Sequence, residues 1–147
     1  MLHVPLHQLD PDLPLPHYAR EGDAGADLVA RADALLACRG GRAVVPTGVA
    51  VAIPVGYAGL VLPRSGLAVR HGITCLNAPG LVDSGYRGEL QVVLVNHDPE
   101  HDYAVSRGDR VAQLVLVRVE EVAFALVPEE GLGESERGGG GFGHTGT

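Results

Sequence analysis

Apolar residues in this sequence occur in short runs that glycine and proline separate. From Ala43 to Val55 the odd positions are Ala, Val, Thr, Val, Val, Ile and Val, which is the period-two pattern of a strand with one buried face. Pro46 and Pro54 indicate that this strand lies at a sheet edge or carries bulges, because proline cannot donate a hydrogen bond to a neighbouring strand.

Further strands are predicted along the chain. The run Val111–Val119 is apolar on both faces, which indicates a central strand. The segment Arg39–Arg42 has the composition of a hairpin turn. The other predicted strands are Met1–Leu6 at an edge, the end of Gly22–Ala30, Ala58–Leu62, Leu90–Asn96, and one or two strands within Ala104–Val127.

One short helix is predicted at Leu67–His71, with Ser65 placed to cap its start and Gly72 to end it. About a dozen short strands without an internal repeat predict an all-β fold, a compact β-barrel or jelly-roll-like domain over residues 1–128. Residues 129–147 are acidic and then rich in glycine, and such a segment cannot bury enough apolar surface to fold alone. We expect it to be a flexible C-terminal arm.

Composition agrees with a single β-rich domain. The chain has 147 residues, of which 46% are hydrophobic but only 4% aromatic, so its core consists of small side chains that favour strands. The formal charge of −7 argues against a general nucleic-acid-binding protein. All 11 basic residues are arginine, and the lack of lysine excludes a Walker-type phosphate loop and Schiff-base chemistry.

Cellular location follows from what the sequence does not contain. There is no signal peptide and no apolar run of membrane-spanning length, so we expect a soluble cytoplasmic protein without a membrane partner. Cys38 and Cys75 match no metal-binding or redox spacing, and we interpret them as free thiols in a reducing compartment.

The stretch Gly80–Leu90 has the pattern of a tight β-hairpin that carries chemistry. Its turn places a carboxylate, Asp83, and an aromatic ring, Tyr86, on two flanks of one bend. Its glycines would let a flat ligand approach the backbone closely. An ordinary surface hairpin is the alternative, because Asp and Gly are common turn residues.

Three other places carry groups that suit an anionic ligand. Arg64 and Ser65 at the predicted helix start offer a guanidinium and backbone N–H groups, although a helix cap with a surface arginine is the simpler interpretation. Gln113 is a lone polar residue in an apolar run, so its amide needs a partner: a neighbouring backbone group, which the sequence favours, or a ligand. In the tail, Arg137 can pair with phosphate and Phe142 can stack on a base, while a disordered glycine-rich terminus is the alternative.

Taken together, five segments resemble the five ordered motifs of the trimeric dUTPase family in its bacterial single-domain form. The resemblance covers nearly the whole chain, and five motifs in order at family-like spacing are highly specific. The segments are Ala24–Leu28, Pro63–Ala68, Gly80–Leu90, Arg107–Leu114 and Arg137–Gly146.

The resemblance implies hydrolysis of dUTP to dUMP and pyrophosphate, which keeps uracil out of DNA and supplies dUMP for thymidylate synthesis. Asp83 would be the general base for a water that attacks the α-phosphorus. Tyr86 would pack under the deoxyribose, and Asp27 would support the phosphate site through a salt bridge or water. The other implied substrate contacts are Arg64, Ser65, Gly66 and Gln113 for the phosphates, Asn77, Gly80, Leu81, Val82 and Gln91 for the uracil, and Arg137, Phe142, Gly143 and Thr145 in the tail.

The resemblance also implies Mg²⁺, held by the triphosphate and water rather than by a protein metal site, and a homotrimer with shared active sites and no nucleic-acid partner. His144 departs from the Ser common in the family, which puts one γ-phosphate contact in doubt. Two alternatives stay open: a dCTP deaminase-like enzyme and a non-catalytic nucleotide-sensing or protein-interaction module on the same fold. The presence of Asp83 and of the tail motif argues against both, and we interpret Glu89, the one nearby candidate for a deaminase acid, as structural.

Overall fold

The alternating run that begins at Ala43 forms the longest strand, β4 (Arg42–Val51), in a computed structural model that describes residues 1–140. The odd positions Val45, Thr47, Val49 and Val51 are buried, as the period-two pattern predicted. Ala50 is buried as well, and Val55, the end of the predicted run, lies beyond β4 and is 88% exposed. Residues 141–147, which include the predicted contacts Phe142, Gly143 and Thr145, lie outside the described part.

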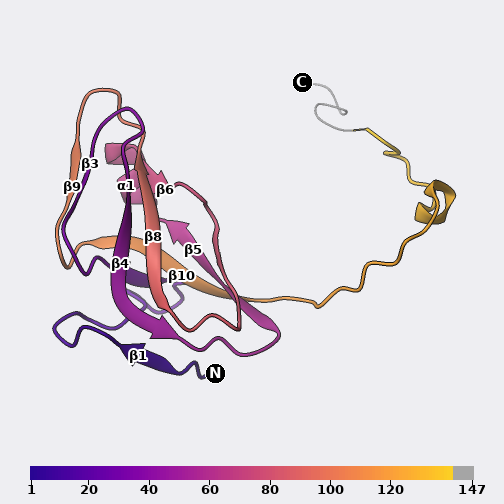
Figure 1. Ribbon diagram of the computed structural model, residues 1–147, viewed down its shortest axis with the longest axis horizontal. Helices are drawn as coiled ribbons and strands as arrows, with labels where there is room; N and C mark the ends of the chain where they lie inside the picture. Colours follow the sequence, from indigo (N-terminus) through magenta and orange to yellow (C-terminus); the bar gives the residue numbers. More distant parts are fainter. Residues whose placement is uncertain (141–147) are drawn as a thin grey trace.

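Strands dominate the described residues, which contain ten β-strands, one α-helix and one 3₁₀ helix, so the predicted all-β class is confirmed with slightly fewer strands than the expected dozen. The strands are drawn in Figure 1, and all their pairings are antiparallel. Side chains of both larger sheets contribute to one core. The first sheet has the strand order β1 (Leu6–Gln8), β4, β8 (Glu89–Asn96) and β6 (Ile73–Cys75). The second sheet has the order β2 (Ala26–Val29), β10 (Arg110–Arg118), β5 (Tyr57–Pro63) and β7 (Gly80–Val82). A third, two-stranded sheet pairs β3 (Ala34–Leu36) with β9 (Tyr103–Val105).

Two predicted strand positions are refined. β4 is an interior strand, so its placement at an edge was wrong, but the predicted bulge is confirmed by a register shift between Pro46 and Ala50. Gly48 in this bulge has φ +76°, a left-handed conformation that glycine adopts without strain. An N-terminal edge strand is present, but it comprises Leu6–Gln8, opposite residues 49–51 of β4, and overlaps the predicted Met1–Leu6 only at Leu6.

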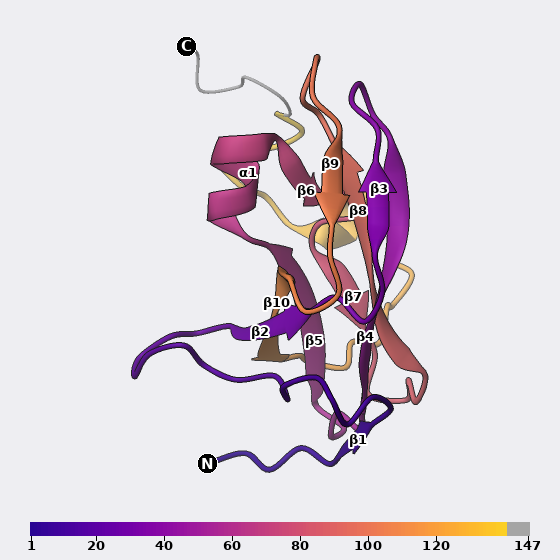
Figure 2. The same ribbon diagram turned by 90° about the vertical axis from the view of Figure 1, so that its left-hand side faces the viewer.

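The helix α1 (Ser65–His71) confirms the predicted helix and its end at Gly72, which has φ +64° and donates its N–H to the carbonyl of Ala68. The cap assigned to Ser65 was wrong. Arg64 is the N-cap residue, no side chain caps the helix start, and Ser65 is the first helical residue. α1 lies at one end of the body and β1 at the other (Figure 2).

The most important difference concerns the predicted hairpins. β7 pairs with β5 in one sheet, whereas β8 pairs with β4 and β6 in the other. The chain at residues 83–88 is therefore a crossing between two sheets and not a hairpin between paired strands. The turn at Arg39 and Gly40 is present, with φ values of 59° and 98°, but it likewise joins β3 and β4, which belong to different sheets.

β10 lies between β2 and β5, which confirms the central strand predicted from its apolar faces. After β10 the described chain runs away from the body, and the 3₁₀ helix η1 (Glu129–Leu132) lies far out along it (Figure 1). No helix within residues 1–140 is long and apolar enough to span a membrane. Cys38 and Cys75 are free, and burial raises the pKa of the Cys75 thiol to about 11.

Asn96 at the end of β8 is fully buried and fastens β8 to two other segments. Its Nδ2 donates to the carbonyls of Leu36, at 3.0 Å, and of His101, at 2.9 Å, and its Oδ1 accepts from the N–H of Asp98 at 2.8 Å. A buried amide with this many partners is expected to contribute strongly to stability.

We predict that Asn96→Leu lowers the free energy of unfolding by about 2–4 kcal/mol, because buried carbonyl and N–H groups lose their partners. Urea unfolding at fixed protein concentration measures the change. Val55→Ala, at a side chain that is 88% exposed, is the control and should leave the midpoint unchanged. An equal, small shift in both variants would contradict the role given to Asn96.

Candidate active site

A cleft lies where the chain crosses from β7 to β8. Its cavity volume is about 320 Å³, within the usual range for small-molecule sites. Asp83 is the one ionisable carboxylic acid among its lining residues, most of which are apolar. The lining residues are Val44, Leu81, Val82, Asp83, Tyr86, Leu90, Gln91 and Val93.

Local hydrogen bonds shape the crossing. The N–H of Tyr86 donates to the carbonyl of Asp83 at 3.1 Å, which closes a turn, and the Tyr86 hydroxyl donates to the carbonyl of Glu89 at 2.8 Å. Arg87 donates to the carbonyls of Ser84 and Tyr86. The structure therefore places Asp83 and Tyr86 on the same cleft, although the hairpin from which their proximity was predicted does not exist.

The residues predicted to bind uracil lie mostly on this cleft. Leu81, Val82 and Gln91 line it. Gly80 belongs to the same strand, and a Cβ there would come within 3.2 Å of Nδ2 of Asn77 and 3.3 Å of Cβ of Val61. Asn77 thus packs on the Gly80 backbone, one step away from the lining residues.

A second cluster of predicted residues forms around a buried carboxylate. Asp27 is 3% exposed, and its oxygens lie 3.4 Å from Nε of Arg64 and 3.2 Å from Nη1 of Arg110. The side-chain amide of Gln113 donates to Oδ1 of Asp27 at 3.3 Å. These contacts come together because β2, β10 and β5 are neighbours, with Gln113 in register with Asp27 on one side and Leu62 on the other.

The contacts of Asp27 test the sequence-based interpretations of Gln113 and of Asp27 itself. The backbone partner favoured for Gln113 was wrong, since its amide binds the Asp27 carboxylate. Asp27 does make the salt bridge expected of it, and Arg64, which was interpreted as a surface arginine or a phosphate ligand, is one partner. Charge explains the arrangement, because a buried carboxylate needs cationic partners and hydrogen-bond donors.

Ser65 and Gly66 begin α1 directly beside this cluster. A Cβ at Gly66 would lie 2.9 Å from Nη2 of Arg70, so the guanidinium covers this glycine at close range. Arg64 and Arg110 therefore converge on the Asp27 carboxylate, and Arg70 lies over Gly66 at the start of α1. Together these arginines form a locally cationic surface suited to phosphate.

The two clusters lie at opposite ends of β5. The pairing of Gly59 with Val82 and of Val61 with Gly80 places Asp83 level with Ala58, at the start of β5. Arg64 follows the end of β5, so the two residues are separated along the sheet by roughly 20 Å at about 3.3 Å per residue. Within one chain, the structure does not bring the Asp83 cleft and the Arg64 cluster together.

Arg137 is also distant from both clusters. Its Nε donates to the carbonyl of Gly140 at 2.8 Å, within the segment that runs away from the body (Figure 1). The remaining tail residues predicted to bind substrate, Phe142, Gly143 and Thr145, are outside the described residues.

Sequence analysis missed Val44, Val93 and Arg110. Val44 and Val93 are opposite each other in the β4–β8 register and form part of the cleft. Their signal was available, since Val44 is apolar on the even, outward face of β4 and is 55% exposed. Arg110 was noticed only as part of a motif, and its contact with Asp27 depends on strand pairing that the sequence does not reveal.

We predict that Asp27→Asn lowers the free energy of unfolding by about 2–3 kcal/mol, because Arg64 and Arg110 would face each other without the carboxylate between them. Urea unfolding measures the loss. Asp12→Asn is the matched control. The Asp12 side chain is 88% exposed and its ion pair with Arg107 is long, at 4.0 Å, so this variant should unfold like the wild type. Equal stability of the two variants would show that the Asp27 cluster does not stabilise the fold.

Comparison with known proteins gives one consistent answer. The family model dUTPase matches residues 12–146. Curated relatives include the deoxyuridine 5'-triphosphate nucleotidohydrolase of Thermobifida fusca (strain YX), 59% identical over 99% of this chain and 79% of that protein, and that of Mycobacterium leprae (strain TN), 55% identical over 95% and 92%.

Solved structures agree with the sequence comparisons. The dUTPase of Staphylococcus bacteriophage 80alpha with dUpNHpp has a TM-score of 0.86 and 28% identity, with full coverage of both chains. A mutant dUTPase from phage phi11 of S. aureus, in a structure that concerns the coordination of a structural Mg(II) ion, has a TM-score of 0.76 and 26% identity, over 87% of this chain and 98% of that one. With the family model covering nearly the whole sequence and close relatives carrying the same name, this chain belongs to the dUTPase family.

Proposed function

We propose that this chain hydrolyses dUTP to dUMP and pyrophosphate, with Asp83 as the general base. The observation that carries the proposal is a single cleft that Asp83, Tyr86 and residues 81 and 82 of β7 line together. Membership of the dUTPase family supports it independently.

Base selection would rest on the backbone of β7. Because β7 is the last strand of its sheet, peptide groups on its outer edge are available to pair with the edge of a flat base, as a further strand would. Leu81 and Val82 would then bind uracil from this edge, with Gln91 and Asn77 at its margins. A closely fitting wall would reject the methyl group of thymine, and fixed backbone donors and acceptors would be mismatched to cytosine.

Sugar selection is assigned to Tyr86. Its ring lies on the cleft while its hydroxyl is held by the carbonyl of Glu89 at 2.8 Å. A ring fixed in this way would pack under deoxyribose and leave no space for a 2′-hydroxyl, which would exclude UTP.

In the chemical step, the Asp83 carboxylate would take a proton from a water molecule as the water oxygen bonds to the α-phosphorus. The bond from that phosphorus to the oxygen bridging to the β-phosphorus would break, and pyrophosphate would leave with the electron pair. Arg64, Ser65, Gly66 and Gln113 would hold the phosphate chain and neutralise its charge.

We propose that the site is completed by other copies of the chain in a homotrimer. The backbones of Asp83 and Arg64 are separated by roughly 20 Å along one sheet, so a single copy does not gather the proposed base and the proposed phosphate ligand at one point. Arg137 lies on a segment that runs away from its own body. A neighbouring copy could supply Arg64, and a further copy the tail with Arg137, Phe142, Gly143 and Thr145.

Mg²⁺ is the cofactor that fits this proposal. Within residues 1–140, His, Cys, Asp and Glu side chains form no group of three or more that could hold a metal ion. The ion would therefore be bound mainly by phosphate oxygens and water, as is usual for Mg²⁺, and would supply neutralisation of phosphate charge.

Three further assignments belong to the proposal. The first is the division into a β body over residues 1–128 and a C-terminal arm over residues 129–147, although the last strand of the body already ends at Arg118. A cytoplasmic location would place the enzyme beside the nucleotide pool. A deaminase role is not favoured, because the Glu89 carboxylate is engaged by the N–H of Gly48 and by Arg31.

We predict that, of dUTP, dCTP, dTTP and UTP supplied with Mg²⁺, only dUTP is converted efficiently, with dUMP and pyrophosphate as products. Chromatographic identification of the products tests this directly. In Asp83→Asn the turnover number should fall by about 10²–10⁴-fold while nucleotide binding is retained, because the amide cannot accept the proton. Undiminished turnover by this variant would remove the general-base assignment, and conversion of dCTP to dUTP with release of ammonia would favour the deaminase.

We also predict that a chain ending at Glu136 loses most of its dUTP hydrolysis without loss of stability. The part of the removed segment that the structure describes, residues 137–140, makes only local contacts, with Ser135 among its partners. Steady-state kinetics and thermal unfolding of the truncated chain are compared with those of the full chain. Full activity after truncation would contradict a role of the tail in closing the site.

A further inference from the structure

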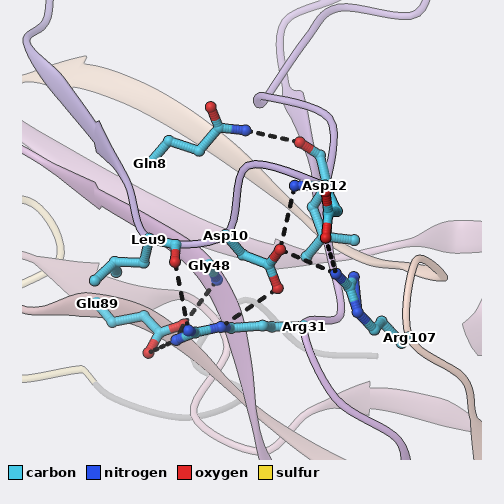
Figure 3. Close-up of polar contacts among 9 residues, drawn as sticks. Gln8, Leu9, Asp10, Asp12, Arg31, Gly48, Glu89 and Arg107 are labelled. Carbon is cyan, nitrogen blue, oxygen red and sulfur yellow. Dashed lines mark hydrogen bonds and ion pairs between the residues drawn. The ribbon is translucent and has the colours of Figure 1, made fainter.

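We propose that Glu89 is a positioning residue that fixes the Asp83–Tyr86 turn for catalysis and sugar selection, and that Arg31 acts through it. The proposal rests on the proposed function of the cleft. It concerns the contacts of the Glu89 carboxylate with Gly48 and Arg31, and of Arg31 with Asp10, which Figure 3 shows and to which the mechanism above assigns no role.

Glu89 binds two different parts of the molecule at once. Its carbonyl accepts the Tyr86 hydroxyl at 2.8 Å, and its carboxylate oxygen Oε1 accepts the N–H of Gly48 at 2.7 Å. Gly48 is the positive-φ residue in the bulge of β4, so its N–H direction is set by a backbone bend in the core sheet. Glu89 thereby connects the Tyr86 ring to the bulge of β4.

Arg31 holds the Glu89 carboxylate from the other side. Its Nη1 lies 3.4 Å from both carboxylate oxygens of Glu89, and its Nε lies 3.5 Å from Oδ2 of Asp10. Arg107 extends the chain by donating to Oδ1 of Asp10 at 2.9 Å. Figure 3 shows Arg31 lying between the carboxylates of Glu89 and Asp10, with Arg107 beyond Asp10.

The carboxylates of this network are partly buried, and its side chains pack closely around Gly48. The side chains of Asp10 and Glu89 are 14% and 20% exposed, so their charges are partly shielded from water. A Cβ at Gly48 would lie 3.1 Å from Cβ of Asp10 and 3.7 Å from Cδ of Arg31. Alternative positions for the Glu89 carboxylate are therefore restricted.

The other hydrogen bonds described in the turn are local, from the Tyr86 N–H to the carbonyl of Asp83 and from Arg87 to the carbonyls of Ser84 and Tyr86. Tyr86 is 43% exposed, and within residues 1–140 its hydroxyl makes one hydrogen bond, to Glu89. A shift of the first residue of β8 would move the ring, and with it the turn that carries Asp83. Small displacements of catalytic groups reduce turnover strongly, which makes Glu89 a residue that acts on chemistry through position.

The test compares Glu89→Ala with Glu89→Gln. Glutamine keeps an oxygen acceptor for the Gly48 N–H but loses the ion pair with Arg31, whereas alanine loses both. For Glu89→Ala we expect turnover of dUTP to fall by about 10–100-fold and the preference for dUTP over UTP to shrink, with partial rescue in Glu89→Gln. Glu100→Gln is the matched control, because Glu100 is exposed and its carboxylate has no hydrogen bond within residues 1–140.

Each outcome decides the proposal. A folded Glu89→Ala protein with wild-type turnover and wild-type dUTP preference would overturn it, as would a lower melting temperature alone, since a purely structural role does not alter selectivity per folded molecule. If Glu89→Ala does not fold, Arg31→Gln carries the same kinetic comparison, and unchanged kinetics there overturn it.

Crystal structures of wild type and Glu89→Gln or Arg31→Gln give a readout that does not depend on activity. Displacement of the Tyr86 hydroxyl and the Asp83 carboxylate supports positioning, and an unmoved turn refutes it. If the wild type itself releases no dUMP, the proposed function fails, while the position of the turn still reports on Glu89.

Discussion

The crossing of the chain from one sheet to the other between β7 and β8 is the constraint on which the candidate site depends. β7 is held in place by β5 and β8 by β4, so the ends of residues 83–88 are fixed by two different sets of strand pairs. A loop with ends fixed in this way borders a cleft, and two of its residues, Asp83 and Tyr86, line that cleft. Rigid strands thus position a short irregular segment, as is common for binding sites on β scaffolds.

Burial of the Asp27 carboxylate organises the other half of the site. A buried negative charge is tolerated only with cationic partners, and here Arg64 and Arg110 come from different strands or strand ends to meet it. The same requirement orients the amide of Gln113. Residues proposed to bind phosphate are therefore preorganised by a carboxylate that need not touch the substrate.

Much of the fold could be predicted because its signals are local. Period-two alternation identifies β4, two apolar faces identify the central strand β10, and Gly72 marks the end of α1. The partner of each strand could not be predicted in this way, because strand pairing depends on residues distant in sequence. The hairpin at Asp83 was wrong since a local turn signal does not reveal which sheet each flanking strand joins, and Gln113 finds its partner 86 residues away. Motif order located the residues of the site, but only the structure separates them into two groups.

The length of β5 sets the distance between the Asp83 cleft and the Arg64 cluster. Its seven residues hold Asp83 near one end and Arg64 beyond the other, so no side-chain rearrangement within a copy can merge them. Under the proposed shared site, catalytic competence belongs to the contact between copies. Two variants that are each inactive, one altered at Asp83 and one at Arg64, would then complement each other when mixed, because some clefts would inherit an intact half from each.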